Sequence, residues 1–151
     1  MWDEVREQAE VELGQLRTLL SYHASLLRAT ETREPDSTEL AAIAGILHSF
    51  YNGIEKIFER IAKDIDHSPP SGSSSHSELL SAMAEDTGDR PPVISEALLR
   101  TLWRYKDFRH FYRHGYTFLL RWSKMADLVA ACQATLDRVE TEVQSFFSTH
   151  E

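Results

Sequence analysis

Apolar side chains recur in alternating steps of three and four residues along most of the chain, and this spacing constrains the fold more than any other feature. The step matches the turn of an α-helix, so one face of each helix is apolar. The repeat is most regular between residues 37 and 66, where it comprises Leu40, Ile43, Leu47, Phe50, Ile54, Ile57 and Ile61. A long helix with one buried face is predicted over this range.

Three further stretches predict long helices: residues 2–29, a segment that starts near Ser95, and residues 114–148. The repeat of the first stretch is interrupted at His23. The last stretch carries Phe118, Trp122, Met125, Val129, Cys132, Leu136, Val139, Val143 and Phe146. Four amphipathic helices and no convincing strand predict an all-α, up-and-down four-helix bundle.

The connections between these helices contain helix-stop and turn residues. Asp36 or Ser37 is available as the N-cap of the 37–66 helix, with Glu39 in its first turn. Residues 67–77 are rich in Pro, Gly and Ser, which predicts a mobile loop. A short extra helix follows in SELLSAMAED, residues 77–86. The chain has the length of one ordinary domain and the 67–77 loop is a connection within it, so we expect one domain over residues 1–151.

Cysteine content and the N-terminal sequence bear on the cellular compartment. The single cysteine, Cys132, lies in an apolar repeat and predicts a small core side chain in a reducing environment. The N-terminus carries acids where a signal peptide carries basic residues, and no apolar run is long enough to span a membrane. We therefore expect a cytoplasmic protein with no membrane contact.

Charge is distributed unevenly along the chain. The net charge is −8, yet residues 100–124 contain seven basic residues and one acid, a local charge of +6 that leaves −14 elsewhere. Within this region the segment FRHFYRHGY, residues 108–116, interleaves Arg and His with aromatic side chains. A solvated basic helix face would explain the charge alone. The interleaved aromatics favour a site for an anion such as a nucleic-acid phosphate.

The segment 108–116, hereafter the motif segment, lies between the third predicted helix and the body of the fourth. Arg109 and His114 are five residues apart, so they meet only if the chain bends or a helix begins between them. Gly115 allows a tight backbone there, and the start of the last helix would offer N–H groups to a phosphate. Arginine would then hold the phosphate and histidine would move a proton, a combination suited to metal-independent RNA cleavage.

Other site types have less support in the sequence. His110 and His114 have the spacing of a metal pair on a helix, but only Asp107 is near enough in sequence to be a third ligand. His23 and His48 lie on apolar stripes and are expected in the core. His67, His76 and His150 lie in predicted loops or at the chain end and indicate no site. Phosphate-loop, nucleophile-elbow, paired-cysteine and dinucleotide patterns are missing, so kinase, other hydrolase and redox classes have no support.

The spacing Arg, four residues, His, one residue, Tyr in the motif segment resembles the signature of HepT-like ribonuclease toxins of the HEPN superfamily. A polar residue usually follows the arginine in that family, and His110 fits. The stretch HSFYNGIEKIFERIA, residues 48–62, resembles the family's second helix, and the motif precedes the last predicted helix as it does there. The resemblance thus covers most of the chain and implies a HEPN-like fold.

The resemblance also implies a function and a set of site residues. It implies a homodimer in which two motifs face each other and form one RNA-cleaving cleft, without metal or cofactor. Arg109 and His114 would be catalytic, with His110 and Arg113 in support. In the related HepT–MntA toxin–antitoxin pairs, a minimal nucleotidyltransferase antitoxin attaches AMP to the motif tyrosine, here Tyr116, with Tyr112 as the next candidate. RNA, and tRNA by analogy, would be the substrate.

Several alternatives remain open from the sequence. Glu55 matches a common residue of the related helix and either reaches the cleft or forms a surface pair with neighbours such as Glu59. The loop 67–77 with its short helix either gates the cleft or contacts the antitoxin. Trp2, Trp103, Trp122, Tyr105 and Tyr112 exceed what a small core takes, so some are expected at a dimer interface. A catalytically silent HEPN module that binds and regulates a nucleotidyltransferase is the alternative function, and a helical adaptor is a third.

Overall fold

The computed structural model describes residues 2–72 and 74–150, which form α-helices and one short 3₁₀ helix. Four long helices make the bundle: α1 (Trp2–Tyr22), α3 (Ser37–Asp64), α5 (Glu96–His114) and α7 (Cys132–Ser148). Shorter elements are α2 (Ala24–Ala29), α4 (Ser75–Met83), η1 (Thr117–Leu119) and α6 (Trp122–Ala130). The described residues contain no strand, so the all-α prediction is confirmed.

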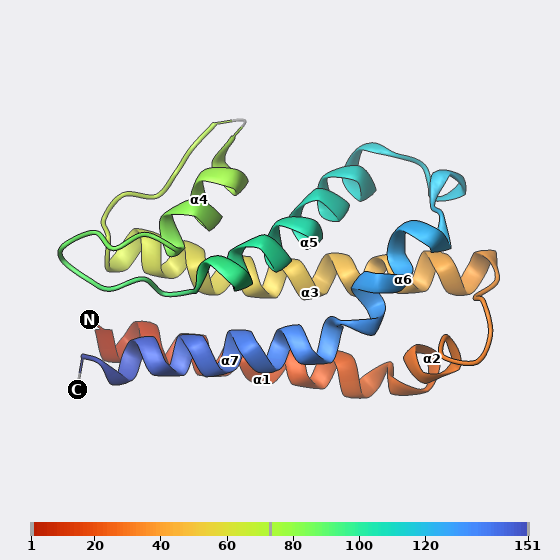
Figure 1. The fold of residues 1–151 in the computed structure, drawn as a ribbon, viewed down its shortest axis with the longest axis horizontal. Helices are drawn as coiled ribbons and strands as arrows, with labels where there is room; N and C mark the ends of the chain where they lie inside the picture. The colour runs from red at the N-terminus through yellow and green to blue at the C-terminus, as the bar shows by residue number, and fades with distance from the viewer. Residues whose placement is uncertain (1, 73, 151) are drawn as a thin grey trace.

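Helix α3 lies at the centre of the bundle. It contacts α1, α5, α4 and α6, while α1 and α7 lie side by side below it and α5 crosses it obliquely (Figure 1). Its N-terminus is fixed by Asp36, whose side chain accepts from Glu39 N at 2.9 Å while Glu39 bonds back to Asp36 N at 3.0 Å. The predicted N-cap and the 37–66 helix are therefore confirmed to within two residues.

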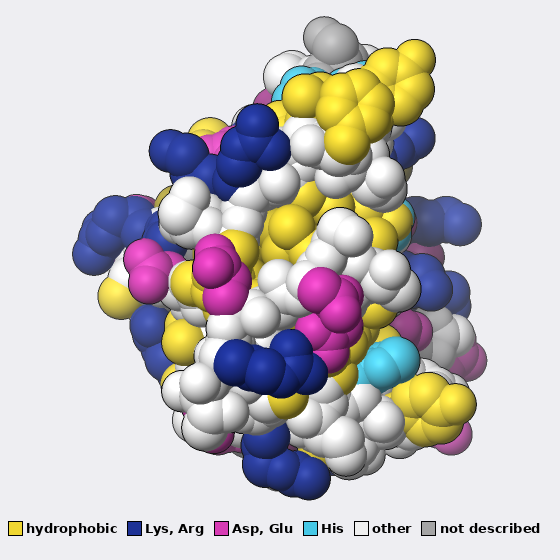
Figure 2. All heavy atoms as spheres, turned by 90° about the vertical axis from the view of Figure 1, so that its right-hand side faces the viewer, with side chains coloured by type: hydrophobic (Ala, Val, Ile, Leu, Met, Phe, Trp, Pro, Cys, Tyr) yellow, Lys and Arg dark blue, Asp and Glu magenta, His cyan; other side chains and the backbone are white. Residues whose placement is uncertain are grey.

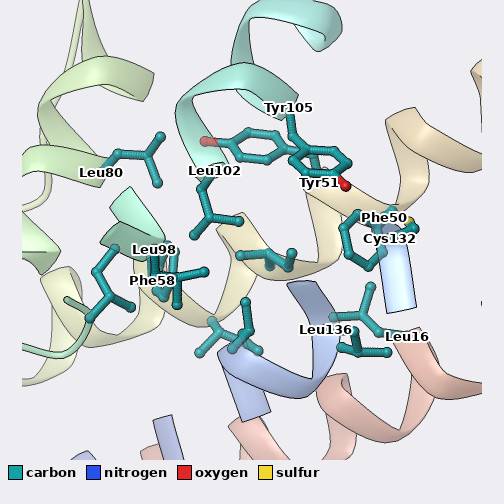
Figure 3. Packing of buried hydrophobic residues seen from close by; sticks show 14 of the residues in the cluster. Leu16, Phe50, Tyr51, Phe58, Leu80, Leu98, Leu102, Tyr105, Cys132 and Leu136 are labelled. Carbon is teal, nitrogen blue, oxygen red and sulfur yellow. The ribbon is translucent and has the colours of Figure 1, made fainter. Parts of the chain in front are cut away.

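The core follows the predicted apolar stripes. All seven apolar positions of the α3 repeat except Leu40 are buried, and Cys132 is buried as expected. Figure 3 shows the buried side chains of α3 and α5 that face each other, among them Phe50 and Tyr105, whose ring centroids are 5.3 Å apart. Helices α1 and α3 pack tightly at Gly53, where an added Cβ would come within 2.6 Å of Leu16 Cδ2. The bundle thus buries its predicted faces around α3.

Two predicted helices are broken. The stretch 2–29 ends its first helix at Tyr22, and the interruption coincides with His23, the one gap in the apolar repeat. The predicted 114–148 helix is wrong at its start, because residues 115–116 and 120–121 are extended and flank η1. It is divided again at Ala131, between α6 and α7, where the apolar repeat gives no sign of a break. Phe118, predicted in the core, is 73% exposed on η1.

Helix α4 is held over α3 and α5 by a buried ion pair. Arg90, in the connection from α4 to α5, donates from Nε and Nη2 to the two carboxylate oxygens of Asp66 at 2.7 and 2.8 Å. It also donates to the carbonyl oxygens of Glu85, Pro91 and Ala82. The Arg90 side chain is 1% exposed. This clamp joins the end of α3 to the connection that follows α4.

Candidate functional site

The motif segment lies mostly within α5 and not between two helices. Helix α5 runs unbroken through His114, so the chain has neither the bend nor the helix start between Arg109 and His114 that would bring both to one cleft. Five residues on a regular helix place two side chains about 140° apart around its axis. Arg109 and His114 of one chain therefore point to different faces of α5.

The expected phosphate site at a helix start is also wrong. Gly115 follows the end of α5, where carbonyl groups and the negative end of the helix dipole lie. Its backbone is extended and needs no left-handed conformation. A Cβ at this position would lie 3.2 Å from Phe111 O, a tight contact, so the chain packs closely against the end of α5 at this glycine. Arg113 and His114 in the last turn match the charge of this helix end.

Arg109 is the centre of a polar cluster between α3, α4 and α5. Its Nε donates to Asn52 Oδ1 at 2.7 Å, and its Nη1 lies 3.3 Å from His76 Nε2. Asn52 Nδ2 in turn lies 3.0 Å from His48 Nε2. These contacts hold the guanidinium by side chains from two other helices.

A buried carboxylate lies behind this cluster. Glu55 is 3% exposed, and its Oε1 lies 2.8 Å from His76 Nδ1. Glu55 Oε2 is buried and has no hydrogen-bond partner among the described residues. Burial and the charge of Glu55 raise the pKa of both Tyr51 and Glu59. Of the two roles left open for Glu55, the structure shows contact with the Arg109 cluster.

Basic side chains extend the cluster along one face of α5. Lys106, Arg109 and Arg113 follow steps of three and four residues, which places them on the same face, hereafter the basic face. Lys106 Nζ donates to Ser77 Oγ of α4 at 3.0 Å. The pKa of His48 lies below its ordinary value because of burial, and the charges of Arg109 and Arg113 lower it further. The basic face is thus positive and suited to an anion.

His110 and His114 lie together on another part of α5. Their ring centroids are 4.5 Å apart, and both side chains are exposed. Asp107, the only nearby acid expected as a third ligand, pairs with Lys106 at 3.1 Å. Within residues 2–72 and 74–150, no group of three His, Cys, Asp or Glu side chains could hold a metal ion. The metal alternative therefore lacks a complete set of protein ligands in this part of the chain.

Exposed apolar side chains gather where α5 ends and η1 begins. Phe111, Tyr116, Phe118 and Leu119, hereafter the apolar end, are 45%, 73%, 73% and 41% exposed. The rings of Tyr116 and Phe118 stack with centroids 5.4 Å apart. Figure 2 faces this end of the molecule and shows hydrophobic side chains at its upper edge and in the hollow beneath, with Lys and Arg around them.

The five aromatic residues of which some were expected at a dimer interface lie in or against the core. Tyr105 is buried and donates to Leu128 O at 2.6 Å, and Trp2 stacks on Phe146. Trp103, Tyr112 and Trp122 are partly buried against the core. None of the five is among the large hydrophobic side chains that are exposed. The exposed apolar side chains at the apolar end come instead from the motif segment and from η1.

The family model for HepT-like proteins matches residues 42–150, which include the residues of the Arg109 cluster and nearly all of α3, α4 and α5, the helices that contribute them. The chain belongs to the HepT-like family. Its all-α fold is HEPN-like, and the resemblance found in the motif segment is confirmed at the level of the family. Searches of curated proteins and of solved structures give no significant match. No helix among residues 2–72 and 74–150 is long and apolar enough to cross a membrane.

Two members of the Arg109 cluster could not be placed from the sequence of this HepT-like protein. Asn52 is one helical turn before Glu55 on α3, and both fall within the stretch that resembles the family's second helix. His76 was expected in a loop without function, whereas it lies in the first turn of α4 and contacts Arg109. Helix α4 starts at Ser75, two residues earlier than its apolar pattern indicated, so His76 is part of the helix.

Proposed function

We propose that this chain is the toxin of a toxin–antitoxin pair and acts as a metal-independent endoribonuclease. The observation that carries the proposal is the fixed position of Arg109 on the basic face, held by Asn52 and His76. A guanidinium stays charged at every working pH and binds phosphate through a planar set of donors. Arg109 would therefore bind the scissile phosphate and stabilise the charge that develops on it.

The separation of Arg109 and His114 supports a homodimer. Because the two side chains point to different faces of α5, a cleft that contains both needs the second copy of the chain. The apolar end lies beside these residues and offers surface that a second copy would bury. In the dimer, His114 would transfer a proton at the phosphate held by Arg109, with His110 and Arg113 in support.

Control by a minimal nucleotidyltransferase of the MntA type fits the position of Tyr116. Its side chain is 73% exposed, so a partner enzyme can reach its hydroxyl group. AMP added there would place a negative charge and a bulky group beside the basic face and exclude the RNA phosphate. The family context of HepT-like proteins supports this assignment, and tRNA is the first substrate to test.

The test is RNA cleavage by the purified protein in EDTA, with tRNA and total RNA as substrates. We expect Arg109→Ala and His114→Ala each to lower the cleavage rate by about 10²-fold or more while the protein stays folded. Arg28→Ala, which removes an exposed arginine on α2, is the control and should cleave at the wild-type rate. Both site variants should also lose growth inhibition in cells.

Two results would change this proposal. A fully active His114→Ala variant would remove the proposed proton carrier of the motif. A wild-type protein that cleaves no RNA, free of AMP by intact mass, would favour the silent HEPN module that binds a nucleotidyltransferase.

A further inference from the structure

His76 lies between the buried carboxylate and the arginine of the site. Its Nδ1 is 2.8 Å from Glu55 Oε1, and its Nε2 is 3.3 Å from Arg109 Nη1. The three residues come from α4, α3 and α5, so three helices converge on one imidazole. The His76 side chain is 37% exposed, whereas that of Glu55 is 4% exposed. The Nδ1 edge of the ring is therefore anchored by a buried carboxylate, while part of the ring is open to solvent.

These two contacts decide where the imidazole carries its proton. The Glu55 carboxylate accepts hydrogen bonds, so Nδ1 of His76 is the donor. A guanidinium only donates, so Nε2 of His76 accepts from Arg109. These contacts fit the tautomer that carries its proton on Nδ1, with the electron pair of Nε2 directed at the guanidinium of Arg109. That arrangement is the base form of a histidine whose orientation is fixed by a carboxylate.

Metal-independent cleavage of RNA requires two proton transfers. One group must take the proton of the 2′-hydroxyl, and another must protonate the 5′-oxygen that leaves. The motif segment provides His114, but His114 and Arg109 of one chain lie on different faces of α5. The histidine that contacts Arg109 within the same chain is His76.

We propose that His76 is a second catalytic histidine, the general base at the phosphate held by Arg109, and that Glu55 is its positioning residue. The proposal rests on the RNA cleavage proposed above. The 2′-oxygen attacks phosphorus as its proton moves to His76 Nε2, and the O2′–P bond forms. The P–O5′ bond breaks, and the 5′-oxygen takes a proton from the acid, the role left to His114. The products are a 2′,3′-cyclic phosphate and a 5′-hydroxyl.

The resting contacts prepare this transfer. An incoming phosphate competes for the guanidinium of Arg109, which frees Nε2 of His76 beside the bound nucleotide. The imidazolium that forms is then paired with the Glu55 carboxylate. A pocket of about 290 Å³, bordered by His76, Glu59 and residues of the loop that precedes α4, lies next to the ring. Solvent or a small molecule can therefore reach it.

The first variants to test are His76→Ala and His76→Gln. We expect both to lower the single-turnover cleavage rate by about 10²- to 10⁴-fold while RNA binding stays within a few-fold of wild type. Gln keeps hydrogen-bonding groups for Glu55 and Arg109 but cannot carry a proton. Added imidazole should restore part of the rate to His76→Ala, because the space that the side chain vacates borders the pocket and is open to solvent. His67→Asn, which keeps a residue that tolerates the positive φ of 55° at that position, is the control histidine.

Glu55→Gln tests the positioning role. The charged groups that face His76 are Glu55 and Glu59 from α3 and Arg109 from α5. Removal of the Glu55 charge destabilises the imidazolium, so the acidic limb of the pH–rate profile, where the rate rises as the general base loses its proton, should move to lower pH. A residue with a purely structural role would leave that limb in place.

The outcomes separate this inference from the function on which it rests. If the wild-type protein cleaves RNA and His76→Gln cleaves at the same rate, His76 only anchors α4 and the inference is overturned. Loss of RNA binding in His76→Ala without imidazole rescue would overturn it as well. If the wild-type protein, free of AMP, cleaves no RNA, the ribonuclease proposal itself fails. Rescue by imidazole together with an inactive Gln variant would establish the base.

Discussion

Arg109 Nε donates to Asn52 Oδ1 at 2.7 Å, and this bond fixes the catalytic candidate of α5 against α3. The amide of Asn52 is oriented in turn, because its Nδ2 lies 3.0 Å from His48 Nε2. An acceptor at Oδ1 and a donor at Nδ2 leave one orientation for the amide. Two helices thus set the direction of the guanidinium before any substrate binds.

We predict that Asn52→Ala lowers RNA cleavage by about ten-fold or more, because an unanchored guanidinium loses its orientation toward the phosphate. The free energy of unfolding should fall by only about 1 kcal/mol, the size of one part-buried hydrogen bond. Single-turnover kinetics and urea denaturation check the two effects separately. Ser49→Ala, an exposed position on the same helix, should change neither. Unchanged cleavage in Asn52→Ala would show that Arg109 needs no support from α3.

The sequence predicts the long helices of the bundle well but not every point at which a helix breaks. Apolar spacing located α3, and the N-cap residue Asp36 set its start. Spacing failed between residues 115 and 121, because the apolar positions Phe118 and Leu119 lie on an exposed 3₁₀ turn and not on a buried face. A periodic pattern alone cannot distinguish a core face from a surface that another chain would cover.

The site was predictable only where residues are close in sequence. The motif segment predicts Arg109 and His114 as site residues, and in the structure Arg109 lies in a polar cluster. Its partners Asn52 and His76 are far from it in the sequence and meet it only through the packing of α3 and α4 against α5. His76 in particular carries no local pattern, because a lone histidine beside a Ser-rich loop is chemically ambiguous.

Tyr116 is the predicted control point of the proposed toxin. Tyr116→Phe should cleave RNA like the wild-type protein and remain toxic when the nucleotidyltransferase is co-expressed. Tyr112→Phe is the matched control and should still be neutralised, because Tyr112 is packed against His48 with ring centroids 5.0 Å apart and is less accessible. Intact mass should show AMP on the wild type and on Tyr112→Phe only. AMP on Tyr116→Phe would place the modification on another residue.

The N-terminus of α3 should show a defined pH dependence. Hydrogen bonds from Arg33, and then from the backbone of Asp36, lower the pKa of Glu39 to about 2. A lowered pKa stabilises the fold at pH values above the ordinary pKa of a glutamate, and this stabilisation is lost as pH falls toward 2. We expect Glu39→Gln to lower the melting temperature at pH 7 and to show a smaller loss between pH 5 and 3 than wild type. Equal pH dependence in thermal melts of both proteins would contradict the ion pair.

Among the charged residues, Arg90 should be the one whose substitution lowers the free energy of unfolding most. Arg90→Ala leaves Asp66 and three carbonyl groups without their donor, so the free energy of unfolding should fall by about 3 kcal/mol or more. Arg138→Ala breaks a half-exposed pair with Glu142 and should cost about 1 kcal/mol or less. Urea denaturation gives both values. If the two variants lose equal stability, the clamp at Arg90 is not buried as described.

The division of Arg109 and His114 between two faces of α5 predicts complementation between inactive variants. If each active cleft takes Arg109 from one chain and His114 from the other, a mixed dimer of Arg109→Ala and His114→Ala contains one intact pair. Equal amounts, after subunit exchange, should regain roughly a quarter of the wild-type cleavage rate, since half of the dimers are mixed and each has lost one of two symmetric pairs. Two Arg109→Ala samples mixed in the same way should stay inactive. If Arg109 and His114 act within a single chain, the mixed sample should also stay inactive, because each chain lacks one of the two residues. His76 would then be the nearer candidate for the histidine that acts with Arg109.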